Sequence, residues 1–294
     1  MNTGEPSAPG FPPQPALVRV VFGASSSRGA SRLINEDHYL VMRLGRFQQT
    51  LLTSLNDDAV AARYDEEGYA VIVADGVGRP GAGERASHLA LATLVHLVRH
   101  HGEWSLRIDD HTAQKLLKRV ERFYRRVDST IVQRRGKGTA SLGQTTLTAT
   151  FGAGRDLFFA HVGHSRAYLF RGGKLLRLTR DHTINRRASA TPVGPLIDVN
   201  KASRDLRHIL TDAIGMEGAA APIIDLERVQ LDDNDRVLVC TNGLTDAIED
   251  ARIAEVLAQG RLPQAQCEAL TALAAAAGGD DDVTAVVAHY RIPS

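Results

Sequence analysis

Apolar and polar positions along this chain predict a protein built from both strands and helices. β-rich runs predict strands at residues 17–22 and 38–42, and the run Tyr69 to Ala74 is apolar enough for a fully buried strand. Between the last two runs, the polar stretch from Arg46 to Gly68 is expected to be irregular. Further strands are expected at residues 145–151, 157–162, 167–170, 174–178, 236–240 and 283–290.

Helical spacing appears in two pairs of segments. Apolar residues recur every three to four positions within 91–98 and within 116–131, and two later helices are expected at 249–259 and 263–277. The turn around Gly172-Gly173 joins neighbouring strands closely, which indicates an antiparallel sheet. The predicted fold is therefore α+β, an antiparallel β-sandwich flanked by helical layers.

Composition limits the classes of function. The chain has 294 residues with 35 Lys+Arg against 34 Asp+Glu, and this balance argues against a nucleic-acid-binding protein. The only cysteines are Cys240 and Cys267, a count that excludes a disulfide framework and suits the cytoplasm. No apolar stretch is long enough to cross a membrane. Residues 1–16 contain five prolines and are expected to form a disordered tail before a single domain at 17–294.

Acidic residues stand where predicted strands begin or end. Glu36-Asp37 opens one strand, Asp75-Gly76 ends the most apolar strand, and Asp281-Asp282 opens the last strand. A carboxylate in such a place has a rigid base and an exposed head, which suits a hard cation such as Mg²⁺ or Mn²⁺. Each pair taken alone also fits an ordinary turn, because Asp and Gly are frequent turn residues.

Taken together, the local sequences match a known family. Eight motifs occur in order: Arg32-Leu-Ile-Asn-Glu-Asp37, Val73-Ala-Asp-Gly-Val-Gly78, Gln144-Thr-Thr-Leu147, Ala160 to Leu169, Leu178 to Thr183, Leu210 to Gly215, Asp235 to Asp246 and Asp281-Asp-Val-Thr284. This series resembles the metal-dependent protein phosphatases of the PPM (type 2C) family in its bacterial form. The resemblance covers residues 18 to 291.

The resemblance implies an activity and a cofactor. Members of this family share the β-sandwich with outer helices. They hydrolyse phosphoserine and phosphothreonine in proteins by means of a water that bridges two Mn²⁺ or Mg²⁺ ions. Carried over by position, Asp75 would bridge both ions and Gly76 would offer its carbonyl to one. Glu36 and Asp37 would be acidic ligands, directly or through water, and Asp281 would hold the other ion.

The same resemblance assigns the substrate phosphate to Arg32, which makes Arg32 and Asp75 the expected catalytic residues. A guanidinium is a natural fork for a phosphoryl dianion. The implied partner is a protein phosphorylated on Ser or Thr, either a cognate kinase or a target of that kinase, and the implied setting is signalling. No nucleic acid or membrane is expected as a partner.

Two positions depart from the family pattern. His164 and Asn242 stand where the family has aspartates that hold metal. Asn keeps an oxygen but loses a charge, and His replaces a hard oxygen by nitrogen, which Mn²⁺ tolerates better than Mg²⁺. We therefore expect a phosphatase with an altered metal site and altered or reduced activity. The alternative is a pseudophosphatase that binds phosphorylated partners without turnover.

Other chemistries fit less well. A cysteine phosphatase needs Arg six positions after Cys, whereas Asp246 follows Cys240 and Leu273 follows Cys267 at that distance. The glycines after Asp75 do not form a nucleotide loop, because Pro80 interrupts them and no Lys follows. The stretch from 183 to 207 contains Pro and Gly and is expected to be a flap beside the site.

Overall fold

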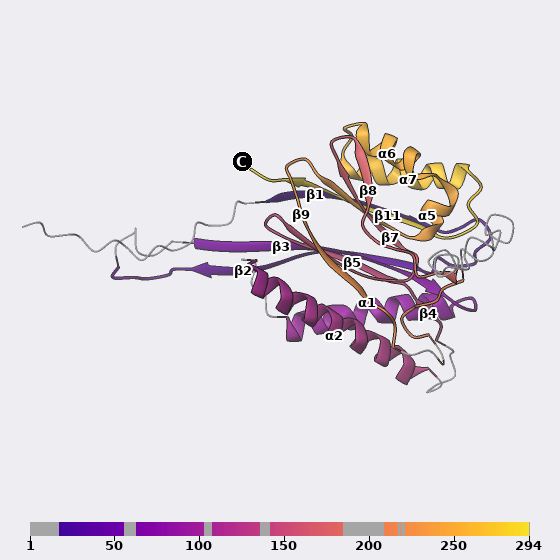
Figure 1. Cartoon of the computed structure of the whole chain (residues 1–294), viewed down its shortest axis with the longest axis horizontal. Helices are drawn as coiled ribbons and strands as arrows, with labels where there is room; N and C mark the ends of the chain where they lie inside the picture. Colours follow the sequence, from indigo (N-terminus) through magenta and orange to yellow (C-terminus); the bar gives the residue numbers. More distant parts are fainter. Residues whose placement is uncertain are drawn as a thin grey trace, which may run out of the picture.

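Two antiparallel sheets face each other between outer layers of helices (Figure 1). The computed structural model describes residues 18–55, 63–102, 108–135, 142–184, 209–216, 218 and 221–293. Within them, no helix is long and apolar enough to cross a bilayer. The predicted tail at 1–16 and most of the predicted flap at 183–207 lie outside the described residues.

The first sheet has five strands in the order β1-β11-β10-β7-β8, and all of its neighbours are antiparallel. Its strands are β1 (Arg19–Ser27), β7 (Arg166–Arg171), β8 (Lys174–Arg177), β10 (Arg236–Cys240) and β11 (Val283–Arg291). The β7–β8 turn is the expected two-residue hairpin, since Gly172 and Gly173 have φ of 56° and 80° and Arg171 pairs with Lys174.

The second sheet has the order β2-β3-β5-β6-β9, with the short β4 paired to β3. Its strands are β2 (Asp37–Gln49), β3 (Arg63–Val77), β4 (Gln144–Thr145), β5 (Leu147–Ala153), β6 (Asp156–Val162) and β9 (Asp225–Gln230). The edge strand β9 was not predicted, because its sequence has few apolar residues and it is only partly buried.

Helices cover the outer face of each sheet (Figure 1). Helices α1 (Ala82–His101) and α2 (Asp110–Arg134) pack on the six-stranded sheet. On the five-stranded sheet lie α5 (Asn242–Ala247), α6 (Asp250–Ala258) and α7 (Pro263–Ala276). The predicted α+β sandwich with helical layers is confirmed, and α5 is a six-residue helix that the sequence pattern did not predict.

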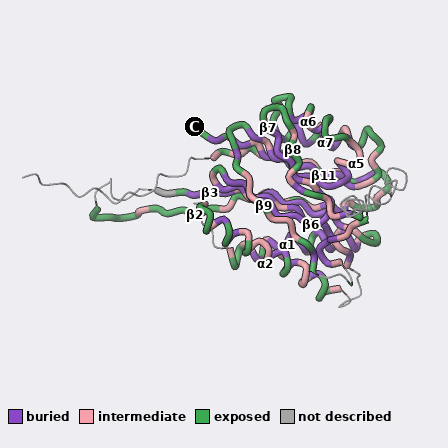
Figure 2. Tube along the Cα trace, viewed as in Figure 1, coloured by how far each residue is buried: buried purple, intermediate pink, exposed green. Residues whose placement is uncertain are grey.

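The core is divided among these layers (Figure 2). Valines such as Val71, Val239 and Val286 fill the space between the sheets. A second cluster, including Leu94 and Tyr124, lies under α1 and α2, and a third lies under α5 to α7. Both sheets are therefore buried on two faces, which explains why their central strands are continuous apolar runs.

The expectation of an irregular stretch at 46–68 was wrong for residues 46–49 and 63–68. Strand β2 continues to Gln49 and β3 starts at Arg63, and the two pair without interruption from Asp37↔Asp75 to Gln49↔Arg63. Residues 45–49 are all exposed, so no buried face imposes an apolar alternation on the outer part of the hairpin. A strand without a buried face lacks the periodic signal by which strands are recognised.

Candidate metal centre

The centre is built around two aspartates on neighbouring strands. Asp37 begins β2 and Asp75 lies near the end of β3, and the register places them directly opposite each other. Opposed residues of an antiparallel pair have Cβ atoms about 5 Å apart, so the two side chains share one face of the sheet. Both are buried, each with 7% of its surface exposed.

One oxygen of Asp37 is held by two threonines, Thr284 in β11 and Thr241 between β10 and α5. Thr241 and Thr284 each donate a hydroxyl hydrogen bond of 2.8 Å to Oδ2. The other oxygen, Oδ1, is buried without a hydrogen-bond partner. Burial raises the pKa of Asp37 to about 7, against the opposing effect of the two hydroxyls and with a further contribution from Asp282 and Asp281. A bound cation would offset both the burial and the repulsion.

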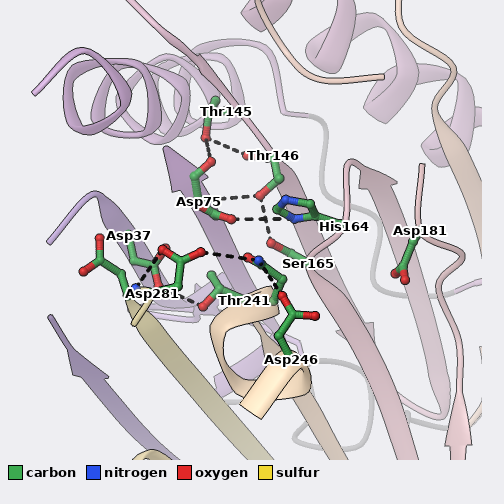
Figure 3. A network of polar contacts seen from close by, with 12 residues as sticks. Asp37, Asp75, Thr145, Thr146, His164, Ser165, Asp181, Thr241, Asp246 and Asp281 are labelled. Atoms are coloured by element: carbon green, nitrogen blue, oxygen red, sulfur yellow. Dashed lines mark hydrogen bonds and ion pairs between the residues drawn. The ribbon is translucent and has the colours of Figure 1, made fainter. Parts of the chain in front are cut away.

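Asp75 is fixed through its backbone. Its amide donates to Thr146 Oγ1 at 3.0 Å, and its carbonyl accepts from Thr145 Oγ1 at 2.8 Å and from the Thr146 amide at 2.9 Å (Figure 3). Burial, followed by the charges of Asp37 and Asp281, raises the pKa of the Asp75 carboxyl well above its usual value. The strand end thus presents a rigid, desolvated carboxyl group.

Gly76 and Glu36 join this strand end to the start of α1. A Cβ at Gly76 would lie 2.3 Å from the backbone of Gly83, so only glycine permits this approach. The Gly76 amide donates to the Glu36 carbonyl at 3.2 Å, and Glu36 Oε1 accepts from the Gly81 amide at 2.7 Å. Glu36 Oε2 is buried without a hydrogen-bond partner and lies 3.9 Å from Arg32 Nη1.

The two aspartates before β11 have different surroundings. Asp282 accepts from the amides of Gly29 and Glu36 at 2.9 and 2.8 Å, so it fixes the loops that carry Arg32 and Glu36. Asp281 instead pairs with the Arg32 guanidinium, with 2.5 Å between Nη2 and Oδ1. Beside them opens a pocket of about 460 Å³. Its lining consists of Ser31, Arg32, Leu33, Ile34, Glu36, Pro80, Asp280 and Asp281.

His164 lies next to Asp75, the residue expected to bridge the two metal ions. Its Nδ1 is 3.6 Å from Asp75 Oδ2, and Figure 3 shows the imidazole directed at that carboxylate. Two residues further on, Arg166 donates to Asp181 at 3.1 and 2.8 Å, which fixes the start of β7. The neighbouring Ser165 hydroxyl lies 2.8 Å from Thr146 Oγ1, so the turn is also tied to the backbone of Asp75.

Asn242 bridges two carboxylates. Its Nδ2 donates to Asp246 Oδ2 at 2.9 Å and lies 3.5 Å from Asp281 Oδ2, whereas Oδ1 is buried without a hydrogen-bond partner. The side chain comes from the first turn of α5, which follows directly on β10. The amide therefore supplies a donor at a place where an aspartate would add a third negative charge.

The donor set fits hard divalent cations. Asp37, Glu36 and Asn242 each keep one buried oxygen without a hydrogen-bond partner, and oxygen ligands are those that Mg²⁺ and Mn²⁺ prefer. In the part of the chain that the structure describes, no three His, Cys, Asp or Glu side chains already surround one point. The carboxylates are thus neighbours that a cation would draw together.

The structure brings together all the residues that the sequence indicated. Arg32, Glu36, Asp37, Asp75, Gly76, His164, Asn242 and Asp281 lie around one edge of the sandwich. Sequence reasoning did not assign the supporting roles of Thr146, Thr241, Asp282 and Thr284. All four stand within the motifs quoted above, and this membership was the signal by which the sequence could have indicated them.

Fold and site together define a class, a two-sheet sandwich with carboxylates gathered at one edge beside an arginine. The sequence profile described as protein phosphatase 2C matches residues 53–276, well over half of the chain. The serine/threonine protein phosphatase PstP of Mycobacterium tuberculosis is 32% identical over 260 residues, which cover 85% of this chain and 45% of that protein. The chain belongs to the protein phosphatase 2C family.

Solved structures agree with this assignment. The catalytic domain of PstP in complex with two manganese ions superposes with a TM-score of 0.66 at 28% identity, covering 93% of this chain and 99% of that one. The serine/threonine phosphatase of S. agalactiae gives a TM-score of 0.73 at 23% identity over 92% of this chain and 99% of its own, a likeness of fold. The chain spans about half the length of the full PstP protein.

Proposed function

We propose that this protein is a metal-dependent serine/threonine phosphatase that removes phosphate from phosphoserine and phosphothreonine in proteins. The observation that carries the proposal is the opposed pair Asp37 and Asp75, buried beside Asp281 and next to a pocket that contains Arg32. Family membership and the two manganese ions of the PstP catalytic domain support Mn²⁺ or Mg²⁺ as the cofactor.

Each residue has a distinct role in this proposal. Asp75 would bridge two ions, the Gly76 carbonyl, Glu36 and Asp37 would be further ligands, and Asp281 would hold the other ion. When bound, such ions supply the Lewis acidity that activates a water molecule and neutralises charge on phosphorus. The threonines on Asp37 and the backbone bonds to Asp75 keep the two carboxylates in place.

Arg32 would orient the substrate phosphate. Its side chain is 40% exposed at the pocket, and its present partner is Asp281. A phosphoryl dianion accepts two parallel hydrogen bonds from a guanidinium and carries more charge than one carboxylate. Arg32 can therefore exchange Asp281 for the phosphate when a cation compensates the aspartate.

The test is turnover of a phosphothreonine peptide with Mn²⁺, with Mg²⁺ and with chelator. We expect phosphate release that needs the metal and is faster with Mn²⁺. Arg32→Ala should raise KM and lower kcat/KM by at least about tenfold without changing metal stoichiometry. Arg252→Ala, an exposed arginine on α6, serves as the matched control. Equal kinetics for Arg32→Ala and the parent would contradict the assignment.

Asn242 favours a second candidate, a pseudophosphatase. The amide and Arg32 both satisfy Asp281 without any cation, so the cluster is partly neutralised by the protein itself. Such a site would bind a phosphorylated protein through Arg32 without turning it over. Phosphopeptide binding by a parent that shows no turnover in either metal would favour this candidate over the enzyme.

We also propose a cytoplasmic setting in signalling. Cys240 and Cys267 are buried thiols without a disulfide, which suits a reducing compartment. The corresponding partner is a protein phosphorylated on Ser or Thr, a kinase or one of its targets. Comparing the phosphoproteins of cells that contain this protein with those of cells that lack it would identify the partner. An unchanged set of phosphosites would contradict the proposal.

A further inference from the structure

The hairpin of β2 and β3 continues beyond the sandwich. Strand β5 pairs with β3 only up to Gly68↔Ala153, so β2 is the one described strand that pairs with residues 63–67. We call residues 43–55 and 63–68 the arm. Figures 1 and 2 show the arm extending away from the body, with most of its residues exposed.

The arm carries large apolar side chains in water. Phe47, Leu51, Leu52 and Leu55 are 76%, 80%, 96% and 59% exposed. Single exposed apolar residues are normal on a protein surface, but a group concentrated on one projecting element is typical of an interaction site. The arm is also not needed to close the core, because none of these four residues belongs to a core cluster.

The arm also presents an edge of its sheet. Strand β2 is the terminal strand of its sheet, and among the described residues no strand pairs with its outer edge. An unpaired edge offers backbone donors and acceptors to another strand. The edge and the apolar side chains together fit a partner that adds a strand, which is a common mode of protein recognition.

The charges of the arm distinguish between two kinds of partner, a lipid surface and a second copy of this chain. Residues 43–49 contain Arg43 and Arg46, a charge of +2, and residues 63–68 contain one arginine against Asp65, Glu66 and Glu67, a charge of −2. The connecting residues add Asp57 and Asp58, so residues 43–68 carry a net charge of −2, and an anionic lipid surface has no electrostatic attraction for the arm. A strand of mixed arginine, aromatic and neutral residues can instead pair with a copy of itself.

We propose that two copies of this chain associate through their arms, with β2 antiparallel to β2 of the second copy and a two-fold axis at Phe47. This register places Phe47 opposite its own copy, Arg46 opposite Gln48 and Gly45 opposite Gln49. No like charges are then opposed, whereas an axis at Arg46 would place two guanidinium groups face to face. Aromatic pairs across strands are among the favourable ones.

The proposed pairing leaves the metal centre open. Phe47 lies ten residues along β2 from Asp37, which is about 34 Å in an extended strand. Association through the arms therefore presents two independent sites on one particle, and its test does not depend on whether the site hydrolyses phosphate. A two-fold interface of this kind is closed and does not propagate into filaments.

Sedimentation velocity of the full chain over a range of concentrations tests the proposal. We expect a reversible dimer whose dissociation constant rises at least about tenfold in Phe47→Glu, because two carboxylates would then be opposed at the axis. Leu176→Glu is the matched control, since Leu176 is a 51% exposed residue on β8, the edge strand of the other sheet. A parent that stays monomeric up to about 100 µM, or equal effects of the two variants, would overturn the proposal.

A cysteine variant tests the register separately. In Phe47→Cys the two thiols would be near the axis, within the Cα separation of 4.4–6.8 Å that a disulfide needs. We expect a covalent dimer under mild oxidation, formed faster than in Leu52→Cys, whose residue is not opposed to its copy. Cys240 and Cys267 do not compete, because both are buried. Equal rates in the two variants would overturn the axis at Phe47.

A vesicle experiment covers the other kind of partner. A parent that remains monomeric yet sediments with phosphatidylglycerol–phosphatidylcholine vesicles would overturn the dimer and show that the arm binds a lipid surface instead.

Discussion

A single amide, Asn242, distinguishes this acidic centre from one made of carboxylates alone. Its Nδ2 lies between Asp246 and Asp281, so Asn242→Asp should have opposite effects with and without metal. With chelator, a third carboxylate should lower Tm by several degrees, at about 2–4 °C per kcal/mol for a domain of this size. With Mn²⁺ the added charge should raise the affinity about tenfold.

Thermal melting and metal titration measure both effects. Asn234→Asp is the matched control, because Asn234 also donates to an aspartate but is exposed and remote from the centre. His164→Asp alone should change Mn²⁺ affinity little, and the double variant should exceed the sum of the two single changes. An Asn242→Asp protein that binds Mn²⁺ no better than the parent would show that this position does not contact the ions.

His161 provides a residue-level prediction on pH. It is fully buried between two hydrogen bonds, with Nδ1 2.8 Å from the Thr148 hydroxyl and Nε2 3.0 Å from the Arg180 carbonyl. Burial, and then the neighbouring His182, lowers the pKa of the imidazole to about 3. The unfolded chain, with an ordinary His pKa of about 6.5, takes up a proton first as pH falls.

The contribution of His161 to stability is therefore complete above about pH 6.5 and is lost as pH falls towards 3. At pH 5 the loss should be about 2 kcal/mol relative to pH 8. His161→Gln should be less stable than the parent at pH 8 but should lose less stability on acidification. Urea unfolding at both pH values measures this, and parallel losses in parent and variant would refute a buried neutral imidazole.

The contact between the end of β3 and the start of α1 positions the centre at the level of elements. Gly76→Ala would place a Cβ 2.3 Å from the Gly83 backbone, where no side chain can move aside. We expect a loss of about 3 kcal/mol or more of stability together with weaker metal binding. Differential scanning calorimetry with and without Mn²⁺ measures both.

Gly154→Ala serves as the control for this prediction. Gly154 has φ of +58°, and a Cβ at this position would have nothing within 4 Å, so alanine there meets only the left-handed backbone cost of about 1 kcal/mol. Metal binding in Gly154→Ala should be unchanged. If the two variants lost equal stability and both kept their metal affinity, the close approach of Gly76 to α1 would have no special role.

Across the whole molecule, the sequence predicted the sandwich well because its central strands are buried on both faces and read as apolar runs, as in 69–74 and 283–290. It failed where that signal is absent. Residues 45–49 of the hairpin are exposed on both faces of the strand, and β9 and α5 are short elements with few apolar positions.

The candidate site was predictable to a different extent. Strand ends and motif matches indicated the acidic residues. The threonines that hold Asp37 are 204 and 247 positions away from it in the chain. Periodicity describes one element at a time and does not specify which side chains meet across two sheets. The pairing of Arg32 with Asp281 is likewise a contact between distant loops.

The central proposal is that Asp75 would bridge two divalent cations at the edge of the sandwich. Calorimetric titration of the full chain with Mn²⁺ tests it most directly, with Asp75→Ala compared against Glu255→Ala, an exposed carboxylate on α6. We expect about two ions per chain for the parent and for Glu255→Ala, and no tight pair for Asp75→Ala. Two unchanged sites in Asp75→Ala would contradict the account.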